Sequence, residues 1–417
     1  MNRIGPISRT RRACLHLSVV ASLAAMLFAP ALAAPAKNPG EFWVATWGAS
    51  PVAPLPANTT NPGFSNQTVR SVIHTSVGGT AVRIRLSNAF GTDSVVIGAA
   101  HVAMHDSGVV SVAGSDHTLA FSGSASVTIP PGALAVSDPV EFTVPALADL
   151  VVSVYLPGPT GQATWHPAAH ATTYVSRAGD FTANPQMPVD RTVTSWFYLT
   201  DVEVAAPKHV PAIVTLGDSI TDGTNSTTDA NRRWPNFLAS RLVEQHMNLA
   251  VVDQGIGGNR ILHDVAGPNA LARFDRDVLA QTGVSYVTVL LGINDIGRSS
   301  AGQSPQPVSA DDIIAGHRQM IARAHELGLK IIGCTLTPFE GASYFTAEGE
   351  SKRAAVNAFI RSGGAYDGVI DFDAAVRDPN HPARFKTDFD SGDHLHPNDA
   401  GYEAMADAID LSLFKGK

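Results

Sequence analysis

The sequence is short of cysteine and of charge, and each shortage excludes a class of protein. It has two cysteines in 417 residues, Cys14 and Cys334. That number is too small for the disulfide framework that stabilises small secreted domains. Only 16% of the residues are charged, and the formal net charge is −8. Because no long run of Lys and Arg is present, we expect neither nucleic acid nor an anionic membrane surface as a main partner.

Long apolar runs are also missing after the N-terminal segment, since none approaches the roughly 20 residues that a membrane span needs. Residues 1–33 instead have the pattern of a signal peptide. A basic stretch precedes an apolar run over 15–28, and the small-residue motif A-L-A follows at 31–33. We therefore expect cleavage after this motif and a secreted or periplasmic protein, with a membrane anchor as the alternative. The pair Arg11 and Arg12 leaves Sec and twin-arginine export both open.

Residues 41–205 contain many short β-rich runs separated by Gly, Pro, Asp and Ser. In one of them Val82, Ile84 and Leu86 alternate with arginines, the period-2 pattern of a half-buried strand. No convincing amphipathic helix interrupts these runs. Many short strands without helices predict an all-β sandwich, of jelly-roll type, as an accessory domain over this range.

The pattern changes over residues 210–417, where apolar strand-like runs alternate with helical patterns. The strand-like runs are Ala212–Leu216, Leu249–Val252, Tyr286–Leu291, Lys330–Thr335 and Val369–Phe372. Apolar residues recur at helical spacing over 234–243 and over 313–324, the latter after a capping-box pattern at Ser309 and Asp312. Near-continuous apolar strands between helices predict a parallel sheet covered on both faces. Five such strands predict a flavodoxin-like three-layer α/β/α domain.

Four polar blocks follow these strands, where ligands of open α/β sheets gather. The blocks are Gly217-Asp218-Ser219, Gly255-Ile256-Gly257-Gly258-Asn259, Gly292-Ile293-Asn294-Asp295 and Asp393-His394-Leu395-His396-Pro397. Each block alone is more typical of a turn, a helix cap or a solvated surface. Together they provide the groups that acyl transfer from a serine requires.

A serine nucleophile needs a base and a third group that orients the base. Ser219 is the candidate nucleophile, His396 the candidate base and Asp393, three residues earlier, its partner. The tetrahedral intermediate also needs hydrogen-bond donors. The backbone N–H groups of Ser219 and Gly258 and the side-chain amide of Asn294 are the candidate oxyanion hole.

The four blocks, in this order over 211–417, resemble those of the SGNH (GDSL-type) hydrolase superfamily. The resemblance implies the same roles for Ser219, His396, Asp393, Gly258 and Asn294, and it implies no metal and no organic cofactor. The family often has Asn at the head of its second block, where Asp253 or Gln254 stands here. This departure leaves the choice between Gly257 and Gly258 open.

Other polar and aromatic residues are explained more simply by surface exposure or by packing. His394 is more typical of surface than of a substrate contact, and His317 is typical of a packed helix face. The acids and histidines at 388–396 resemble metal ligands, but they crowd into one segment, so no metal site is expected. Four of the five tryptophans offer either a sugar-stacking platform or, more simply, sandwich core; they are Trp43, Trp47, Trp165 and Trp196.

The sequence therefore predicts a secreted serine esterase for acetyl or other short acyl groups on a small-molecule or polysaccharide ester. A β-sandwich before an SGNH domain resembles the arrangement in some carbohydrate O-acetylesterases. The alternatives are a lipid or aryl acyl esterase on the same site, a metal phosphoesterase, and a degenerate SGNH scaffold that only binds. Acyl length and oligomeric state stay open.

Overall fold

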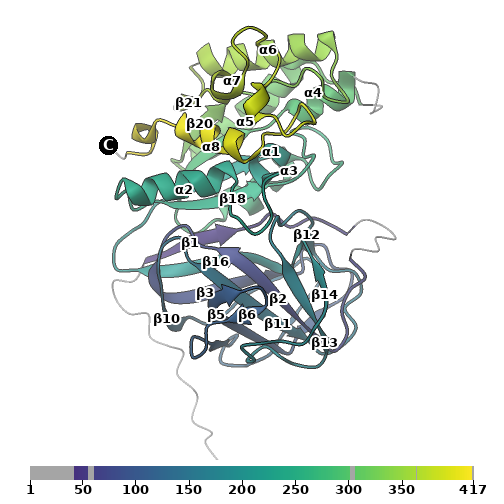
Figure 1. Ribbon diagram of the computed structural model, residues 1–417, viewed down its shortest axis with the longest axis vertical. Coiled ribbons are helices and arrows are strands. Elements are labelled where there is room, and N and C mark those ends of the chain that lie inside the picture. Colours follow the sequence, from purple (N-terminus) through teal and green to yellow (C-terminus); the bar gives the residue numbers. More distant parts are fainter. Residues whose placement is uncertain (1–41, 55–60, 301–305, 363, 416–417) are drawn as a thin grey trace, which may run out of the picture. The chain divides into compact units, whose positions relative to one another are not determined.

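Residues 42–206 form a β-sandwich of two antiparallel sheets in the computed structural model of the chain (Figure 1). The structure describes residues 42–54, 61–300, 306–362 and 364–415, so the expected signal peptide lies outside the described residues. The first sheet contains, in spatial order, β1 (Phe42–Gly48), β16 (Leu199–Ala206), β3 (Gly79–Ser87) and β10 (Val140–Val144), with β9 (Leu134–Val136) paired to β3.

The second sheet is larger and holds the long central strands of the sandwich. Its order is β14 (Val189–Val193), β13 (Thr173–Ala178), β2 (Gln67–His74), β11 (Asp149–Leu156), β5 (Ala99–Ser107) and β6 (Val110–Ser111), with β7 (His117–Leu119) paired to β5. Two short pairs join β12 (Trp165–His166) to β15 (Trp196–Phe197) and β4 (Val95–Ile97) to β8 (Val127–Ile129). The prediction of an all-β first half is confirmed.

The alternation along β3 separates a core face from a polar face. The valine, isoleucine and leucine of this strand are fully buried in the sandwich. Arg83 and Arg85 lie on the opposite face, and each places a guanidinium nitrogen 2.6 Å from a carboxylate oxygen of Glu203 on β16. Glu203 is nevertheless fully buried. The second half of the chain reaches this face, because Arg85 also donates to Oγ1 of Thr282 at 2.5 Å.

The second half contains the predicted parallel sheet of five strands. Their spatial order is β18 (Ala250–Gly255), β17 (Ala212–Gly217), β19 (Val284–Leu290), β20 (Lys330–Cys334) and β21 (Gly368–Ile370). Every neighbouring pair is parallel. Numbered along the chain, the order is 2-1-3-4-5, the flavodoxin-like arrangement that the sequence predicts.

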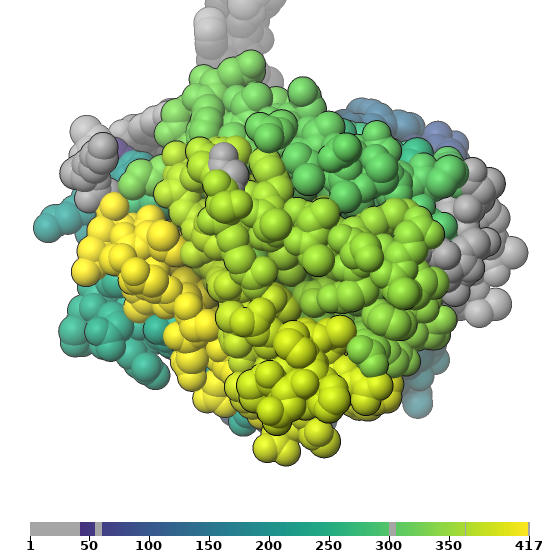
Figure 2. Space-filling model, turned by 90° about the horizontal axis from the view of Figure 1, so that it is seen from above, coloured from purple at the N-terminus to yellow at the C-terminus, as the bar shows by residue number. Residues whose placement is uncertain are grey.

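Helices pack against this sheet, and Figure 2 shows a face on which the later part of the chain, coloured green to yellow, forms most of the surface. One group of mutually contacting helices is α2 (Trp234–Glu244), α7 (Phe372–Val376) and α8 (Asp399–Asp407). A second group is α3 (Ala270–Phe274), α5 (Ala310–Glu326), α6 (Ala347–Ser362) and α4 (Ile293–Ser300). The shorter helical elements are α1 (Ser219–Asp222), η1 (Asp275–Leu279), η2 (Thr387–Phe389) and η3 (Leu411–Phe414).

The capping box predicted at Ser309 and Asp312 begins α5, with reciprocal hydrogen bonds between the side chain of each and the backbone of the other. Within the described part of the chain, none of the helices combines the length and the apolar character that crossing a membrane requires.

The described residues from 42 onward belong to one compact unit, because the two halves share a polar joint. The edge strand β1 packs against the edge strand β18. Across this joint Ala45 donates its N–H to the carbonyl of Thr282 at 3.0 Å, and Val251 donates to Oγ of Ser76 at 3.0 Å. These bonds satisfy backbone groups that the two edges would otherwise leave unpaired.

Arg273 fixes this joint at the ends of the strands that carry the candidate site. Its side chain is buried, and it donates to the carbonyl oxygens of Gly217 and Gln254, each at 2.8 Å. It also donates to Oγ of Ser50, in the loop after β1, at 2.9 Å. One guanidinium therefore ties the carboxyl ends of β17 and β18 to the first half of the chain.

Candidate active site

Ser219 lies in the tight turn between β17 and α1. The helix begins at Ser219, and its N-cap Asp218 accepts the N–H of Ile220 at 3.0 Å. The turn requires glycine before it, because a Cβ on Gly217 would lie 1.9 Å from Oγ1 of Thr221. Only 7% of Ser219 is exposed. This tight turn thus holds the hydroxyl at the carboxyl end of the sheet.

The structure brings together the three residues that the sequence predicts as nucleophile, base and acid. Nε2 of His396 lies 2.8 Å from Oγ of Ser219. Nδ1 of the same ring lies 2.6 Å from Oδ2 of Asp393. A carboxylate at Nδ1 places the ring proton on that nitrogen and leaves Nε2 to accept a proton from the serine.

Asp393 is held by groups on both of its oxygens. Oδ1 accepts the N–H groups of Leu395 and His396, each at 2.9 Å. Oδ2 accepts a side-chain N–H of Asn225 at 2.9 Å besides its bond to the His396 ring. Burial opposes the charge, but the hydrogen bonds from His396 and Leu395 hold the pKa of Asp393 well below its usual value. The carboxylate therefore stays ionised at neutral pH.

The glycine block after β18 presents one backbone N–H to the site. Gly257 donates its N–H to Oδ2 of Asp222 at 3.0 Å. The N–H groups of Gly258 and Ser219 have no partner among the described residues. Gly258 has a φ of 76°, the left-handed region that favours glycine. The hydrogen bond of Gly257 therefore favours Gly258 as the oxyanion donor.

Asn294 lies buried at the start of α4, facing the same loop. Its Nδ2 donates to the carbonyl of Asn259 at 3.2 Å, and the hydroxyl of Tyr344 lies 3.5 Å from its Oδ1. The amide thus keeps a second N–H for another acceptor. The next residue, Asp295, accepts the N–H of Ile261 at 2.8 Å. The G-x-N-D block therefore both faces the glycine loop and anchors the chain after it.

Three residues of this site have no recognisable signal in the sequence. His166 of β12 places its Nε2 3.0 Å from Oδ1 of Asp222 and its Nδ1 2.9 Å from the carbonyl of Ser50. Oγ of Ser50 donates to Gln254 at 2.5 Å. Asn225 holds Asp393, as described above. A lone His, Ser or Asn far along the chain from its partner gives no local pattern by which to find it.

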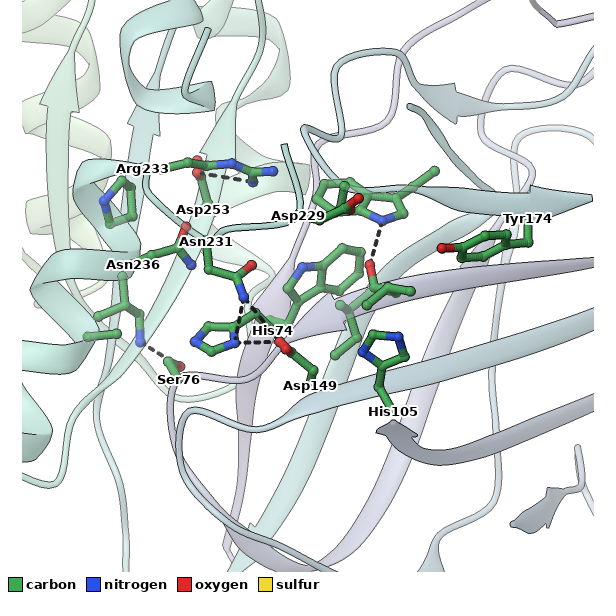
Figure 3. Close-up of a pocket in the computed structure, with 18 of the residues that line it drawn as sticks. His74, Ser76, His105, Asp149, Tyr174, Asp229, Asn231, Arg233, Asn236 and Asp253 are labelled. Atoms are coloured by element: carbon green, nitrogen blue, oxygen red, sulfur yellow. Dashed lines mark hydrogen bonds and ion pairs between the residues drawn. The ribbon is translucent and has the colours of Figure 1, made fainter. Parts of the chain in front are cut away.

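A separate cavity of about 130 Å³ lies at the joint between the halves, and it includes none of the three predicted catalytic residues (Figure 3). Several of its polar groups are paired with each other. His74 and Asn231 both bond Oδ1 of Asp149, at 2.7 and 3.1 Å, and Arg233 lies 3.8 Å from Asp253. The cavity therefore belongs to the packed joint and not to the serine centre.

The other residues considered in the sequence analysis are paired, packed or exposed away from the serine. His394 is about half exposed and lies 2.6 Å from Asp390. His317 is buried on α5, with Nδ1 2.5 Å from the hydroxyl of Tyr366. No group of His, Cys, Asp or Glu suited to a metal ion occurs among the described residues. Three of the four tryptophans are buried in the core, namely Trp47, Trp165 and Trp196.

The site contains a chain of hydrogen bonds from a serine to a histidine to an aspartate, at the carboxyl ends of a parallel sheet. This arrangement is typical of a hydrolase of the serine type. Residues 215–404 match the model of the GDSL-like lipase/acylhydrolase family. The chain thus contains a GDSL-like lipase/acylhydrolase domain over these residues, and the protein is an ester hydrolase. No curated protein sequence matches the chain closely enough to count as a relative.

Solved structures similar to this chain cover about half of it. An acetylxylan esterase, Axe2, from Geobacillus stearothermophilus is 22% identical, with 50% of this chain and 95% of that chain covered and a TM-score of 0.38. The acetyl xylan esterase AlAXEase is 20% identical, with 47% and 96% covered and a TM-score of 0.37. A G-D-S-L family protein from Desulfitobacterium hafniense DCB-2 is 19% identical, with 47% and 96% covered and a TM-score of 0.37.

Proposed function

We propose that the protein is a secreted serine ester hydrolase that removes acetyl or other short acyl groups through an acyl-enzyme on Ser219. The observation that carries the proposal is the continuous chain from Ser219 through His396 to Asp393, at 2.8 and 2.6 Å. These distances allow proton transfer without movement of either residue. Carbohydrate O-acetyl groups are among the expected substrates.

Acylation begins when Oγ of Ser219 attacks the ester carbonyl carbon and its proton passes to Nε2 of His396. The carbonyl electrons move onto the oxygen, which accepts the N–H groups of Ser219 and Gly258 and the free N–H of Asn294. As the intermediate collapses, the carbon–oxygen bond to the alcohol breaks. His396 then gives its proton to that leaving oxygen.

Deacylation repeats these steps with water in place of the serine. His396 accepts a proton from water as the water oxygen attacks the acyl carbon. Collapse of this second intermediate releases the carboxylic acid and returns the proton to Oγ of Ser219. Asp393 stays ionised throughout and stabilises the imidazolium at each step.

Secretion is part of the proposal and follows from the pattern of residues 1–33. Expression in an exporting host with mass spectrometry of the protein outside the cytoplasm tests it. We expect a mature N-terminus at Ala34. A full-length protein that stays with the cells would contradict export and leave the esterase assignment unaffected.

The acyl preference is tested with the p-nitrophenyl esters of acetate, butyrate, octanoate and an aryl carboxylic acid. Acetylated polysaccharides are assayed beside them. We expect kcat/KM to be highest for acetate and to fall with chain length. A maximum at octanoate would favour the alternative of a lipid esterase. Hydrolysis of phosphate esters that a chelator abolishes would favour a metal phosphoesterase.

Two serine variants form the control for the site itself. Ser219→Ala should abolish turnover, because no covalent route remains. Ser240→Ala, on α2, loses only a hydrogen bond from Oγ to the carbonyl of Asn236 at 3.2 Å and should keep wild-type turnover. A wild-type protein that hydrolyses none of the esters would support the alternative of a scaffold that only binds.

A further inference from the structure

We propose that His166, from the first half of the chain, is a positioning residue for the oxyanion hole of the second half. It acts through Asp222 on the Gly257–Gly258 loop. The inference rests on the proposed serine esterase function. It assigns the β-sandwich a part in catalysis that no residue in its sequence indicates.

His166 is bonded through both ring nitrogens to acceptors. Nε2 lies 3.0 Å from Oδ1 of Asp222, and Nδ1 lies 2.9 Å from the carbonyl oxygen of Ser50. A carbonyl oxygen and an ionised carboxylate oxygen only accept, so beside an ionised Asp222 both ring nitrogens donate, and only an imidazolium donates from both. The side chains of His166 and Asp222 are 4% and 2% exposed.

The surrounding charges support the imidazolium. Burial disfavours it, but the Asp222 carboxylate and the hydrogen bonds of the ring raise the pKa of His166 above its usual value. Burial likewise opposes ionisation of Asp222, yet His166, with smaller contributions from His170 and Arg233, holds the pKa of Asp222 low. The two residues therefore form a buried ion pair between the halves.

Asp222 connects His166 to the Gly257–Gly258 loop. One oxygen bonds His166, and the other accepts the N–H of Gly257 at 3.0 Å. The loop passes so close to α1 that a Cβ on Gly255 would lie 2.3 Å from the backbone nitrogen of Asp222. Since Ser219 begins α1 and Gly258 follows Gly257, this carboxylate sets the spacing between the nucleophile and the second oxyanion donor.

Loss of His166 would free that carboxylate to turn toward other donors. Arg233 is one alternative charge, because it contributes to the low pKa of Asp222 and packs over Trp196. A turned carboxylate releases the Gly257 N–H, and the Gly258 donor moves with it. Donors of this kind act within a few tenths of an ångström of their best position, so a small displacement lowers the rate of the chemical step.

The simpler alternative is that the ion pair only holds the two halves together. A purely structural pair would lower the melting temperature on substitution while each folded molecule kept its normal kcat. A positioning residue instead lowers kcat and leaves KM nearly unchanged, because the oxyanion donor acts on the transition state more than on bound ester.

The test compares His166→Gln with His101→Gln in the full-length protein. His101 is the matched control, because it is buried, lies 2.8 Å from Asp116 within the first half, and has no part in the site. End-point labelling with a fluorophosphonate, read by mass spectrometry, counts the competent serines in each preparation. The rate with p-nitrophenyl acetate is then expressed per labelled site.

We expect His166→Gln to lower kcat per labelled site by about 10- to 100-fold with KM nearly unchanged. We expect His101→Gln to match the wild type. A His166→Gln protein with kcat per site within about twofold of wild type would overturn the proposal. If the single variant does not fold, the double variant His166→Gln/Asp222→Asn, which leaves no unpaired buried charge, is measured in its place: a lower kcat per site with KM nearly unchanged supports the His166–Asp222 pair as the positioning unit, and an unchanged kcat overturns the proposal.

Failure of the underlying function gives a different result. In that case the fluorophosphonate leaves Ser219 unlabelled in the wild type, or Ser219→Ala keeps full activity. Labelling at Ser219 with an unchanged His166→Gln variant instead refutes only the role of His166.

Discussion

The side-chain amide of Asn225 lies 2.9 Å from Oδ2 of Asp393, although 168 positions separate them in the sequence. The same amide nitrogen lies 2.9 Å from Oγ of Ser391, which in turn donates to Oδ1 of Asp393 at 3.2 Å. Asn225 has a φ of 68°, in the left-handed region that Asn adopts more readily than most residues. The loop after α1 thus fixes the acid that orients His396.

Asn225→Ala is expected to lower kcat by about 3- to 10-fold, because a hydrogen bond to a charged group of roughly 1.5 kcal/mol is lost. Asn225→Gly is the matched control, since glycine tolerates the positive φ without the amide. We expect both variants to lose the same activity in steady-state assays. A loss in the alanine variant alone would show that backbone strain, and not the amide, is the cause.

Asp393→Asn is expected to lower kcat by about 10² to 10⁴, because an amide at this position no longer fixes the ring tautomer or stabilises the imidazolium. The fold should be unchanged, since a large part of the Asp393 side chain is exposed. The low pKa of Asp393 keeps its carboxylate ionised from neutral to mildly acidic pH, so titration of Asp393 itself should not change the wild-type rate over that range. Steady-state kinetics with circular dichroism on one preparation measures both effects.

Asn294→Ala separates a working oxyanion donor from a structural one. Loss of a donor typically lowers kcat by about 10² to 10³ with little change in KM. The hydrogen bond from Asn294 to the carbonyl of Asn259 is also lost, so a lower melting temperature is expected besides. A lower melting temperature with normal kcat would remove Asn294 from the mechanism.

The candidate catalytic residues could be recognised in the sequence because their signals are local. His396 and Asp393 share one turn, so the spacing D-x-x-H already places the carboxylate at the ring. The parallel sheet then brings Ser219 to the same edge, since strand ends meet there. The two fold classes follow from hydrophobic periodicity, which is equally local.

The supporting residues could not be predicted, because their partners are distant in the sequence. His166 and Asp222 are 56 residues apart, and His166 and Ser50 are 116 apart. A single histidine in a β-rich half carries no periodicity that points to another domain. The choice between Gly257 and Gly258 likewise depended on one long-range hydrogen bond, from Gly257 to Asp222.

Asp253 provides a prediction about stability and pH. Its side chain is 13% exposed near the end of β18, where Oδ1 accepts the N–H of Gly255 at 2.9 Å and Oδ2 lies 3.8 Å from Arg233. Burial raises the pKa of Asp253 to about 7, although Arg233 counters it. In the unfolded chain the same carboxyl titrates near about 3.9.

The direction in which stability changes with pH follows from proton uptake. Between about pH 4 and pH 7 the folded state holds a proton at Asp253 that the unfolded state releases, so stability falls as pH rises through this window. Asp253→Asn cannot ionise. The melting temperature of this variant should therefore fall less between pH 5 and pH 8 than that of the wild type, by an amount corresponding to at most about 3 kcal/mol.

Part of the slope should remain in Asp253→Asn, because burial also raises the pKa of Asp218 to about 7 and that of Asp201 to about 6. Asp190→Asn is the control, since Asp190 is exposed and its loss should leave the wild-type slope unchanged. Melting curves of the three proteins at half-unit pH steps decide the matter. If Asp253→Asn keeps the full wild-type slope, the folded protein holds Asp253 ionised, and its pairing with Arg233 outweighs the effect of burial.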